Sequence, residues 1–180
     1  TIFSSRGISL EDFTLERQLG KGSYGTVYQV VHKQSGETYA MKVMSKKMLH
    51  QKKQVAHTMG ERNIMAGANH PFVQSLRYAF QTKTKVYIVN EMMPGGELYF
   101  YMRGNKRHPE PAMKFYAIEV ILALEYLHTH DVVYRDLKPE NILVDADGHI
   151  RLTDFGLARQ ETKGAFDAKT LCGTPEYLAP

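Results

Sequence analysis

Hydrophobic and polar residues alternate through the first part of the chain in the manner of β-strands. From Phe13 to about Met44 the sequence is rich in β-branched and aromatic residues, with one run at 24–31 and another at 38–43. Turn-forming residues, Gln-Ser-Gly-Glu, separate the two runs at 34–37. The pattern predicts three antiparallel strands in this region.

The following segment changes to a helical period. Residues 54–66 are expected to form one amphipathic helix, with apolar side chains at Val55, Met59, Ile64 and Met65. The sequence Asn-His-Pro at 69–71 is expected to end this helix. Two more strands and a Pro-Gly-Gly linker are predicted next, near 73–80, 86–90 and 94–96.

The chain beyond this linker predicts mainly helices. A short helix is expected at 97–102 and a longer one at 110–130. The longer helix carries an apolar flank formed by Phe115, Ile118, Ile121, Leu122 and Leu124. After it, a turn at 145–148 separates two short strands, Ile142–Val144 and Ile150–Leu152.

These elements together predict an α+β fold with two lobes. A small lobe with an antiparallel sheet is expected over 13–93, and a helix-led lobe begins at 94 and continues to 180. The sequence contains no internal repeat and no low-complexity stretch, so each lobe is built from distinct elements.

The charge and the cysteine content of the chain limit its possible binding partners and cellular locations. The net charge is +4, from 23 Lys and Arg against 19 Asp and Glu, and the basic residues are too dispersed to indicate nucleic-acid binding. The single cysteine, Cys172, cannot form an internal disulfide, which fits a reducing compartment. The sequence shows neither a membrane-length apolar run nor a signal-peptide core, so a cytoplasmic or nuclear location is expected.

A glycine-rich sequence at 20–25 is the first candidate site, and it consists of Gly20, Lys21, Gly22, Ser23, Tyr24 and Gly25. Its G-x-G-x-x-G pattern is shared by dinucleotide-binding folds and kinases, and glycines also serve plain hairpin turns. A dinucleotide site needs a helix after the third glycine, whereas the residues that follow favour a strand. A Walker A loop needs a lysine where Thr26 stands. The context therefore favours a hairpin whose backbone amides lie over nucleotide phosphates.

Lys42 supports this nucleotide interpretation. It lies in the middle of a predicted strand, where a charge facing a core is costly unless it meets an anion such as a phosphate. Glu61 on the predicted helix is a natural counter-charge for Lys42, although an isolated helical Glu is more commonly a solvated surface residue.

The most informative segment is Tyr134–Asn141, with the sequence Tyr-Arg-Asp-Leu-Lys-Pro-Glu-Asn, followed by Asp-Phe-Gly at 154–156. These residues match the H-R-D-L-x-x-x-N and D-F-G motifs, with tyrosine in place of the histidine. The glycine loop, Lys42 and the Thr-Pro-Glu sequence at 174–176 occur in the order found in protein kinases. The chain therefore resembles eukaryotic serine/threonine protein kinases over nearly its whole length, and the resemblance implies the bilobal kinase fold.

The resemblance also implies ATP and Mg²⁺ as cofactors. Phosphoryl transfer mainly needs positioning and charge neutralisation. By resemblance, Asp136 is the catalytic carboxylate, and Lys138 is the lysine that neutralises the transferring phosphate in serine/threonine kinases. Asn141 and Asp154 are expected to hold Mg²⁺, which prefers hard oxygen ligands.

Further roles in nucleotide binding are carried over on the same terms. Val27, Ala40 and Leu143 are expected to enclose the adenine. The backbone from Glu91 to Met93 is expected to contact it as a hinge. Asn90 precedes this hinge where related kinases usually have an apolar residue, which leaves the shape of the pocket open.

The remaining implied roles concern phosphate and protein substrates. Lys42 and Glu61 are expected to form the catalytic ion pair beside the phosphates. Glu97 and Glu140 resemble the acidic residues that meet the ribose and an arginine three positions before the acceptor, so protein substrates with basic Arg-x-x-Ser/Thr motifs are expected. Thr174 is assigned to the same substrate site.

Within protein kinases, the chain resembles the AGC group, which includes cyclic-AMP-dependent kinase and Akt. The resemblance is carried by the sequences at 57–62, 134–136 and 171–178. In that group the threonine before Leu-Cys-Gly-Thr, here Thr170, is phosphorylated by an upstream activating kinase. A phosphate there is expected to pair with Arg135, Arg159 and His57.

The end of the sequence departs from the kinase pattern. Ala179 and Pro180 stop one residue short of an expected glutamate, and the helices that normally complete the second lobe do not follow. A fragment is therefore expected, with an exposed apolar surface, poor solubility and little activity by itself.

Other functions stay open at this point. An ATP-binding pseudokinase scaffold would usually lack Lys42, Asp136 or Asp154, and none of the three is lost. A nucleotide-dependent oxidoreductase is disfavoured by the strand predicted after the glycines. Residues 143–154 partly imitate a calcium loop, but its first ligand position falls on Leu143, which cannot coordinate calcium.

Overall fold

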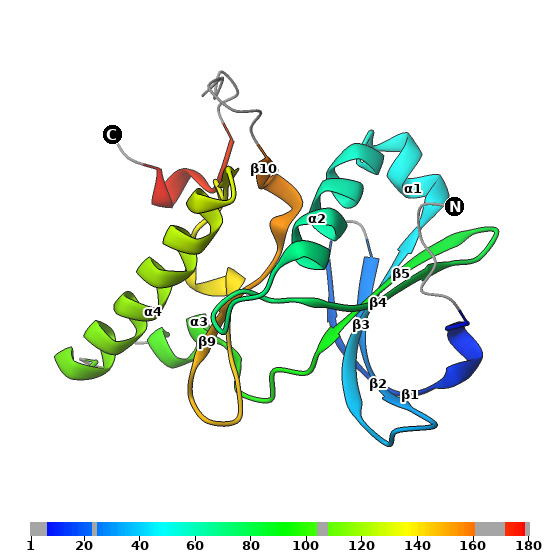
Figure 1. Ribbon diagram of the computed structural model, residues 1–180, viewed down its shortest axis with the longest axis horizontal. Helices are drawn as coiled ribbons and strands as arrows, with labels where there is room; N and C mark the ends of the chain where they lie inside the picture. Colours follow the sequence, from blue (N-terminus) through cyan, green and yellow to red (C-terminus); the bar gives the residue numbers. More distant parts are fainter. Residues whose placement is uncertain (1–6, 23–24, 104–107, 161–171, 179–180) are drawn as a thin grey trace.

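The chain folds into a strand-rich lobe followed by a helical lobe, as the sequence predicts. The computed structural model describes residues 7–22, 25–103, 108–160 and 172–178. The N-terminal sheet lies at the right in Figure 1, and the long helix α4 of the C-terminal lobe lies at the left. The two lobes are joined by the segment that follows strand β5.

Five antiparallel strands form the sheet of the N-terminal lobe, in the order β1-β2-β3-β5-β4. They are β1 (Phe13–Lys21), β2 (Gly25–His32), β3 (Thr38–Ser45), β4 (Leu76–Gln81) and β5 (Lys85–Glu91). A 3-10 helix, η1 (Leu10–Asp12), precedes them and is capped by Ser9. β-Branched and aromatic residues pack well on the pleated, half-buried surface of a sheet. Their enrichment in the sequence therefore predicts these strands.

The two faces of this sheet bury different clusters, because successive side chains of a strand point to opposite faces. In β3, Tyr39 and Met41 enter an outer cluster with Phe13, whereas Met44 enters an inner cluster. Lys42 shares the face of Met44. Its charged group therefore lies on the inner side of the sheet, where the helices and the second lobe are packed.

Two helices follow β3, α1 (Lys46–Gln51) and α2 (Val55–Gly67). Helix α2 confirms the helix predicted at 54–66, with each boundary shifted by one residue. The sequence does not predict α1, because Leu49 is its one buried residue. Its N-terminus is capped by the side chain of Ser45, which is also the last residue of a strand.

The segment before β4 connects the two lobes instead of continuing the strand predicted near 73–80. The amide of Gln74 donates to the carbonyl of Leu152, and the amide of Leu152 donates to the carbonyl of Phe72, both over 2.9 Å. Val73 lies between these two bonds and is fully buried. Strand β4 therefore begins only at Leu76, because residues 72–74 are already paired with the second lobe.

The C-terminal lobe combines helices with short strand pairs. Its elements are β6 (Gly96–Glu97), α3 (Leu98–Met102), α4 (Glu110–Thr129), β7 (Val132–Val133), η2 (Pro139–Asn141), β8 (Ile142–Val144), β9 (Ile150–Leu152), η3 (Phe155–Leu157), β10 (Arg159–Gln160) and η4 (Pro175–Tyr177). Strands β6, β8 and β9 form one sheet, and β10 pairs with β7. The two predicted helices and the hairpin of β8 and β9 are confirmed.

The predicted Pro-Gly-Gly linker is partly a strand. Gly96 belongs to β6, and the amide of Gly95 donates to the carbonyl of Val144 over 3.0 Å. A β-carbon at Gly95 would lie 2.8 Å from that same oxygen. Glycine is therefore required here by the close approach of two backbones, in addition to its effect on the turn.

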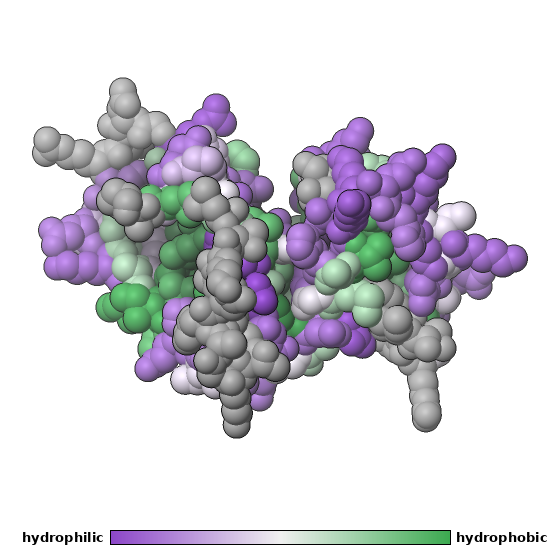
Figure 2. All heavy atoms as spheres, turned by 90° about the horizontal axis from the view of Figure 1, so that it is seen from above, coloured by the Kyte–Doolittle hydropathy of each residue, from purple (hydrophilic) through white to green (hydrophobic). Residues whose placement is uncertain are grey.

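Helix α4 turns its apolar flank outward. Ile118 is 58% exposed and Ile121 is 63% exposed, whereas the buried residues of this helix are Glu119, Ala123 and Leu127. Hydrophobic residues gather at the surface of the helical half, at the left in Figure 2. Across the described ranges, no helix has both the length and the apolar character needed to cross a membrane.

Candidate active site

Lys42 and Glu61 meet between the sheet and helix α2. The Nζ atom of Lys42 lies 2.7 Å from Oε1 of Glu61 and 4.0 Å from Oδ1 of Asp154. Glu61 is only 5% exposed, so its carboxylate has little contact with water. The ion pair therefore holds helix α2 against strand β3 and brings the Asp-Phe-Gly segment close to the same ammonium group.

The charges around Lys42 favour its protonated form. Burial acts to lower the pKa of Lys42, but the carboxylates of Glu61 and Asp154 together outweigh it and raise the pKa. Burial also raises the pKa of the Glu61 carboxyl, and the Lys42 ammonium opposes that rise. An ammonium held at this inner face can bind an anion such as a phosphate.

Asp136 follows strand β7, and three side chains hold its carboxylate. Thr174 Oγ1 donates to Oδ1 over 2.7 Å, Asn141 Nδ2 donates to Oδ2 over 2.9 Å, and Lys138 Nζ lies 3.0 Å from Oδ2. Lys138 Nζ also donates to Thr174 Oγ1 over 2.9 Å. Both carboxylate oxygens thus have fixed partners, one of which comes from η4, far along the chain.

These contacts keep Asp136 ionised. Burial acts to raise the pKa of Asp136, but the hydrogen bonds from Thr174, Lys138 and Asn141 outweigh burial and hold the pKa below its usual value. The carboxylate is therefore an acceptor of fixed orientation at neutral pH, which is what a group that positions a hydroxyl requires.

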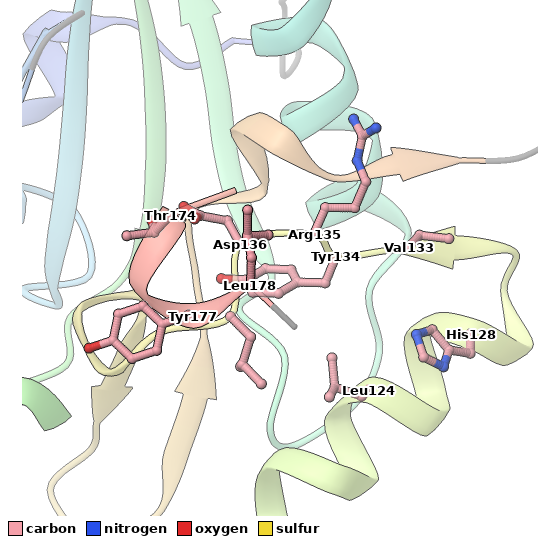
Figure 3. A pocket seen from close by; sticks show the side chains of 10 residues that line it. Leu124, His128, Val133, Tyr134, Arg135, Asp136, Thr174, Tyr177 and Leu178 are labelled. Carbon is pink, nitrogen blue, oxygen red and sulfur yellow. Dashed lines mark hydrogen bonds between the residues drawn. The ribbon is translucent and has the colours of Figure 1, made fainter. Parts of the chain in front are cut away.

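A pocket of about 240 Å³ lies beside this cluster, between helix α4 and η4 (Figure 3). Asp136 and Thr174 lie together on one side of it, and Leu124 of α4 lies on the opposite side. The Arg135 side chain points away from these residues, and its Nε donates to the carbonyl of Leu157 over 2.8 Å. The bond links the segment that contains Asp136 to Leu157, the residue immediately after the Asp-Phe-Gly sequence.

Tyr134, which replaces the histidine of the motif, is part of the core. It is 2% exposed, its hydroxyl donates to the carbonyl of Thr153, and its ring packs edge to face with that of Phe155 at 5.5 Å. Phe155 is fully buried, whereas the side chain of Asp154 remains 55% exposed. The buried aromatic pair therefore anchors the segment that presents Asp154.

Asn141 and Asp154 offer oxygen atoms that fit Mg²⁺. The amide nitrogen of Asn141 donates to the backbone and side chain of Asp136, which leaves its Oδ1 as the atom suited to a metal. Over the residues described, no three His, Cys, Asp or Glu side chains gather into a metal site. The protein donors therefore suit a hard cation that also takes water and phosphate oxygens.

The glycines at 20, 22 and 25 lie at the paired ends of strands β1 and β2. The amide of Gly22 donates to the carbonyl of Gly25 over 2.9 Å, and a β-carbon at Gly20 would meet no atom within 4 Å. At Gly25 a β-carbon would lie 2.4 Å from the carbonyl oxygen of Val43, so the two strands need glycine there. Strand β2 begins at Gly25, which contradicts the dinucleotide-binding alternative, because that fold needs a helix at this point.

The residues expected around the adenine come from both lobes. Val27 lies opposite Lys42 across β2 and β3, and Ala40 lies opposite Asn90 across β3 and β5. Leu143 pairs with Glu97 in the sheet of the C-terminal lobe. Ala40 and Lys42 share one face of the sheet, the inner face, because they are two positions apart in the same strand.

The expected hinge backbone already has partners within the protein. The carbonyl of Glu91 accepts from Nε2 of Gln74 over 3.1 Å, and the carbonyl of Met93 accepts from the amide of Gly96 over 3.2 Å. A carbonyl has two lone pairs, so each can still accept a second bond from a ligand. Gln74 is missed by the sequence reasoning, because no motif marks a buried glutamine before a strand.

Asn90 is held next to the hinge by a weak contact. Its Nδ2 lies 3.6 Å from Sδ of Met65, and its Oδ1 is buried without a hydrogen-bond partner in the part of the chain that the structure describes. Buried polar atoms usually have a hydrogen-bond partner, so this oxygen is an exception, and the effect of Asn90 on the shape of the pocket stays a prediction.

Glu97 and Glu140 form an acidic site between β6 and η2. Burial and, to a smaller extent, the charge of Glu140 raise the pKa of Glu97. Oε2 of Glu140 is buried and has no hydrogen-bond partner among the described atoms. A cationic group would relieve both the repulsion and the missing bond.

Three of the predicted site residues, Ser23, Tyr24 and Thr170, lie outside the described residues. Thr174 is described, and its hydroxyl contacts Asp136 and Lys138, which places it beside the expected catalytic carboxylate. The prediction that it contacts a substrate remains a prediction, since both of these contacts are internal to the protein.

Comparison with known proteins gives a consistent result. Residues 13–180 match the protein kinase domain. The serine/threonine-protein kinase SCH9 of Candida albicans is 49% identical over 178 residues, which cover 97% of this chain and 23% of that protein. The RAC-beta serine/threonine-protein kinase of Homo sapiens is 45% identical over 173 residues, which cover 96% of this chain and 36% of that protein.

A third relative, the RAC family serine/threonine-protein kinase homolog of Dictyostelium discoideum, is 48% identical over 177 residues. The matched residues cover 98% of this chain and 40% of that protein. The chain therefore spans well under half the length of these three curated relatives.

Proposed function

This chain belongs to the protein kinase family, and on that premise we propose that the protein containing it transfers the γ-phosphate of ATP to serine or threonine side chains of proteins. The relatives confirm the resemblance to the AGC group of serine/threonine kinases. Their names support serine/threonine rather than tyrosine as the acceptor, and Lys138 beside Asp136 supports the same choice.

The observation that carries this proposal is the set of bonds around Asp136. Its carboxylate is ionised, fixed by Thr174, Lys138 and Asn141, and largely buried, with 9% of the residue exposed. A carboxylate in this state can accept a hydrogen bond from an acceptor hydroxyl and orient its oxygen for attack on phosphorus. Lys138, at 3.0 Å, supplies positive charge where the transferred phosphate gathers negative charge.

The nucleotide is assigned to the space between the glycine loop and the second lobe. Lys42, held by Glu61, would contact the phosphates, and Asn141 with Asp154 would hold Mg²⁺. Bound Mg²⁺ neutralises phosphate charge and orients the transferred group. Lys42 then acts by electrostatic attraction, and helix α2 acts by keeping Glu61 in place.

The acidic pair Glu97 and Glu140 supports a preference for basic substrates. The raised pKa of Glu97 and the buried, unpaired Oε2 of Glu140 favour a ligand that carries positive charge and several N–H donors. An arginine guanidinium has both properties. We therefore include Arg-x-x-Ser/Thr motifs in the proposal, together with activation through phosphorylation of Thr170 by an upstream kinase.

Label transfer from γ-labelled ATP to peptides tests this function in the intact protein that contains this chain. The peptide Arg-x-x-Ser is expected to accept phosphate faster than its lysine counterpart, because lysine lacks the planar fork of donors. The Glu97→Gln variant should reduce the difference between the two peptides. Binding of ATP without transfer to any peptide would instead indicate an ATP-binding scaffold.

A further inference from the structure

Glu91 ends strand β5, and its carboxylate lies between two arginines from different lobes. Oε1 contacts Nη2 of Arg77 in β4, and Oε2 lies 2.6 Å from Nη1 of Arg151 in β9. Arg77 belongs to the same sheet as Glu91, whereas Arg151 belongs to the sheet of the C-terminal lobe. Of these two ion pairs, the one with Arg151 therefore crosses from lobe to lobe.

Gln74 completes a closed loop of contacts around this ion pair. Its side-chain Nε2 donates to the carbonyl of Glu91 over 3.1 Å, and its backbone amide donates to the carbonyl of Leu152 over 2.9 Å. Leu152 is the neighbour of Arg151 in β9, whose guanidinium returns to Glu91. The loop thus joins the segment before β4, the connection between the lobes, and the hairpin of β8 and β9.

We propose that this loop of contacts, which we name the hinge latch and which consists of Gln74, Glu91, Arg151 and Leu152, limits how fast nucleotide leaves the cleft. Arg151 is a positioning residue in this proposal, because it acts through Glu91 and does not touch the ligand. The proposal rests on the proposed function, since it requires a nucleotide that binds between the lobes.

The latch lies at the start of the connection between the lobes, because Glu91 is the last residue of β5. In this proposal the two lobes separate when nucleotide is released, and the connection that begins at Glu91 bends. The backbone of Glu91 is assigned to face the adenine, while its side chain forms an ion pair with Arg151 of the second lobe. This ion pair restrains the bending of the connection directly. Removing it should therefore make the separation of the lobes easier and the release of nucleotide faster.

The burial of the latch indicates that its effect is moderate. Gln74 is 2% exposed, but the side chains of Glu91 and Arg151 are 22% and 23% exposed. Both line a groove of about 1000 Å³ that also includes Arg77 and Pro94, so water and salt reach the ion pair. A pair of this kind changes an equilibrium or a rate by about two- to fivefold and weakens at high ionic strength.

The dissociation rate of a fluorescent ADP analogue tests the latch. Excess ATP displaces the analogue from the intact protein, and stopped-flow fluorescence records the rate. The Arg151→Met variant should release the analogue about two- to fivefold faster than the wild type at low salt. The difference should shrink as salt is raised, because salt weakens the wild-type pair. Arg151→Gln, which keeps a polar but uncharged side chain, carries the same test if the methionine variant does not fold.

Arg77→Met is the matched control, because it removes an arginine from the same carboxylate without breaking a contact between lobes. Its release rate should equal that of the wild type. Equal rates in wild type and Arg151 variants would overturn the latch, and so would an equal acceleration in Arg77→Met. A wild type that binds no ADP analogue would contradict the proposed function itself, which is a different outcome from normal binding with unchanged release.

Discussion

The hydroxyl of Thr174 donates a hydrogen bond of 2.7 Å to Oδ1 of Asp136, across 38 positions of sequence. The bond connects η4, near the end of the chain, to the segment that follows β7. It also places a neutral donor beside an ionised carboxylate, opposite the side on which Lys138 and Asn141 bind Oδ2. The orientation and the charge of Asp136 therefore both depend on a residue from outside its own segment.

Replacing Thr174 with alanine should impair transfer and shift its dependence on pH. A hydrogen bond to a charged group contributes about 1.5–3 kcal/mol, so a loss of about tenfold or more in kcat is expected at pH 7. The bond lowers the pKa of Asp136, so its removal raises that pKa and moves the acidic limb of kcat/KM to higher pH.

The matched variant for this prediction is Thr174→Ser, which keeps the hydroxyl and removes only a methyl group. It should retain both the rate and the position of the acidic limb. An unchanged pH profile in Thr174→Ala, measured by label transfer between about pH 3 and pH 7, would show that the bond does not set the ionisation of Asp136.

Replacing Glu61 with glutamine should destabilise the fold strongly. The substitution leaves the Lys42 ammonium without its nearest counter-charge, and breaking one partner of a buried pair costs about 3 kcal/mol or more. Lys114 and Glu110 form an ion pair of the same 2.7 Å length on the surface of α4, with side chains 70% and 77% exposed. Glu110→Gln should therefore cost below about 0.5 kcal/mol.

Urea unfolding of both variants measures this difference directly. A similar loss of stability in Glu61→Gln and Glu110→Gln would contradict the importance of burial. The Glu61 variant should also bind ATP more weakly, because the ammonium of Lys42 would no longer be held at the phosphate site.

Replacing Gly25 with alanine should destabilise the N-terminal sheet. Its β-carbon would lie 2.4 Å from the carbonyl oxygen of Val43 and 2.9 Å from Cγ of Met44, so β2 and β3 would have to move apart. Overpacking of this kind costs about 1–3 kcal/mol. Gly20→Ala is the control, since a β-carbon there meets no atom within 4 Å, and its melting temperature should stay near that of the wild type.

The ion pair of His149 and Glu119 should make stability depend on pH. His149 Nδ1 lies 2.5 Å from Glu119 Oε1, and this hydrogen bond and the charge of Glu119 raise the pKa of His149. A raised pKa in the folded state means that the pair stabilises fully below the unfolded pKa of about 6.5. The stabilisation by this ion pair is lost as the pH rises through the higher pKa that His149 has in the folded state.

Thermal melting of wild type and His149→Gln between about pH 5.5 and pH 8.5 checks this sign. The melting temperature of the wild type should exceed that of the variant most at the acidic end of this range. The difference between the two melting temperatures should become smaller toward the alkaline end. In a Glu119→Gln background the same histidine substitution should cause no pH-dependent change. A gap that widens with pH would mean that the pair does not stabilise the charged histidine.

The sequence predicts the local elements of the fold well, because their signals lie within a few neighbouring residues. The strands follow from β-branched residues, and helix α2 follows from the spacing of Val55, Met59 and Ile64. Helix α1 is missed, since it buries one residue and depends on a cap from Ser45. Val73 is misplaced in a strand, because its pairing with Leu152 is a contact between lobes that no local pattern contains.

The candidate site divides in the same way. The motifs identify Lys42, Asp136 and Asp154 because kinase chemistry requires those residue types in that order. The sequence also indicates Glu61 as the counter-charge of Lys42, which the structure confirms, but no motif identifies the Thr174 hydroxyl as a partner of Asp136. The latch residue Arg151 is also missed, since an arginine in a short strand has no feature that distinguishes it from a solvated one.

Asp136 is proposed to position an acceptor hydroxyl for phosphoryl transfer from ATP. The most direct test is label transfer from γ-labelled ATP, with Mg²⁺, by the intact protein and its Asp136→Asn variant, with ATP affinity measured in parallel. The variant should bind ATP with similar affinity and transfer phosphate at least about a hundredfold more slowly. Equal transfer by the variant, or ATP binding without transfer by the wild type, would contradict this proposal.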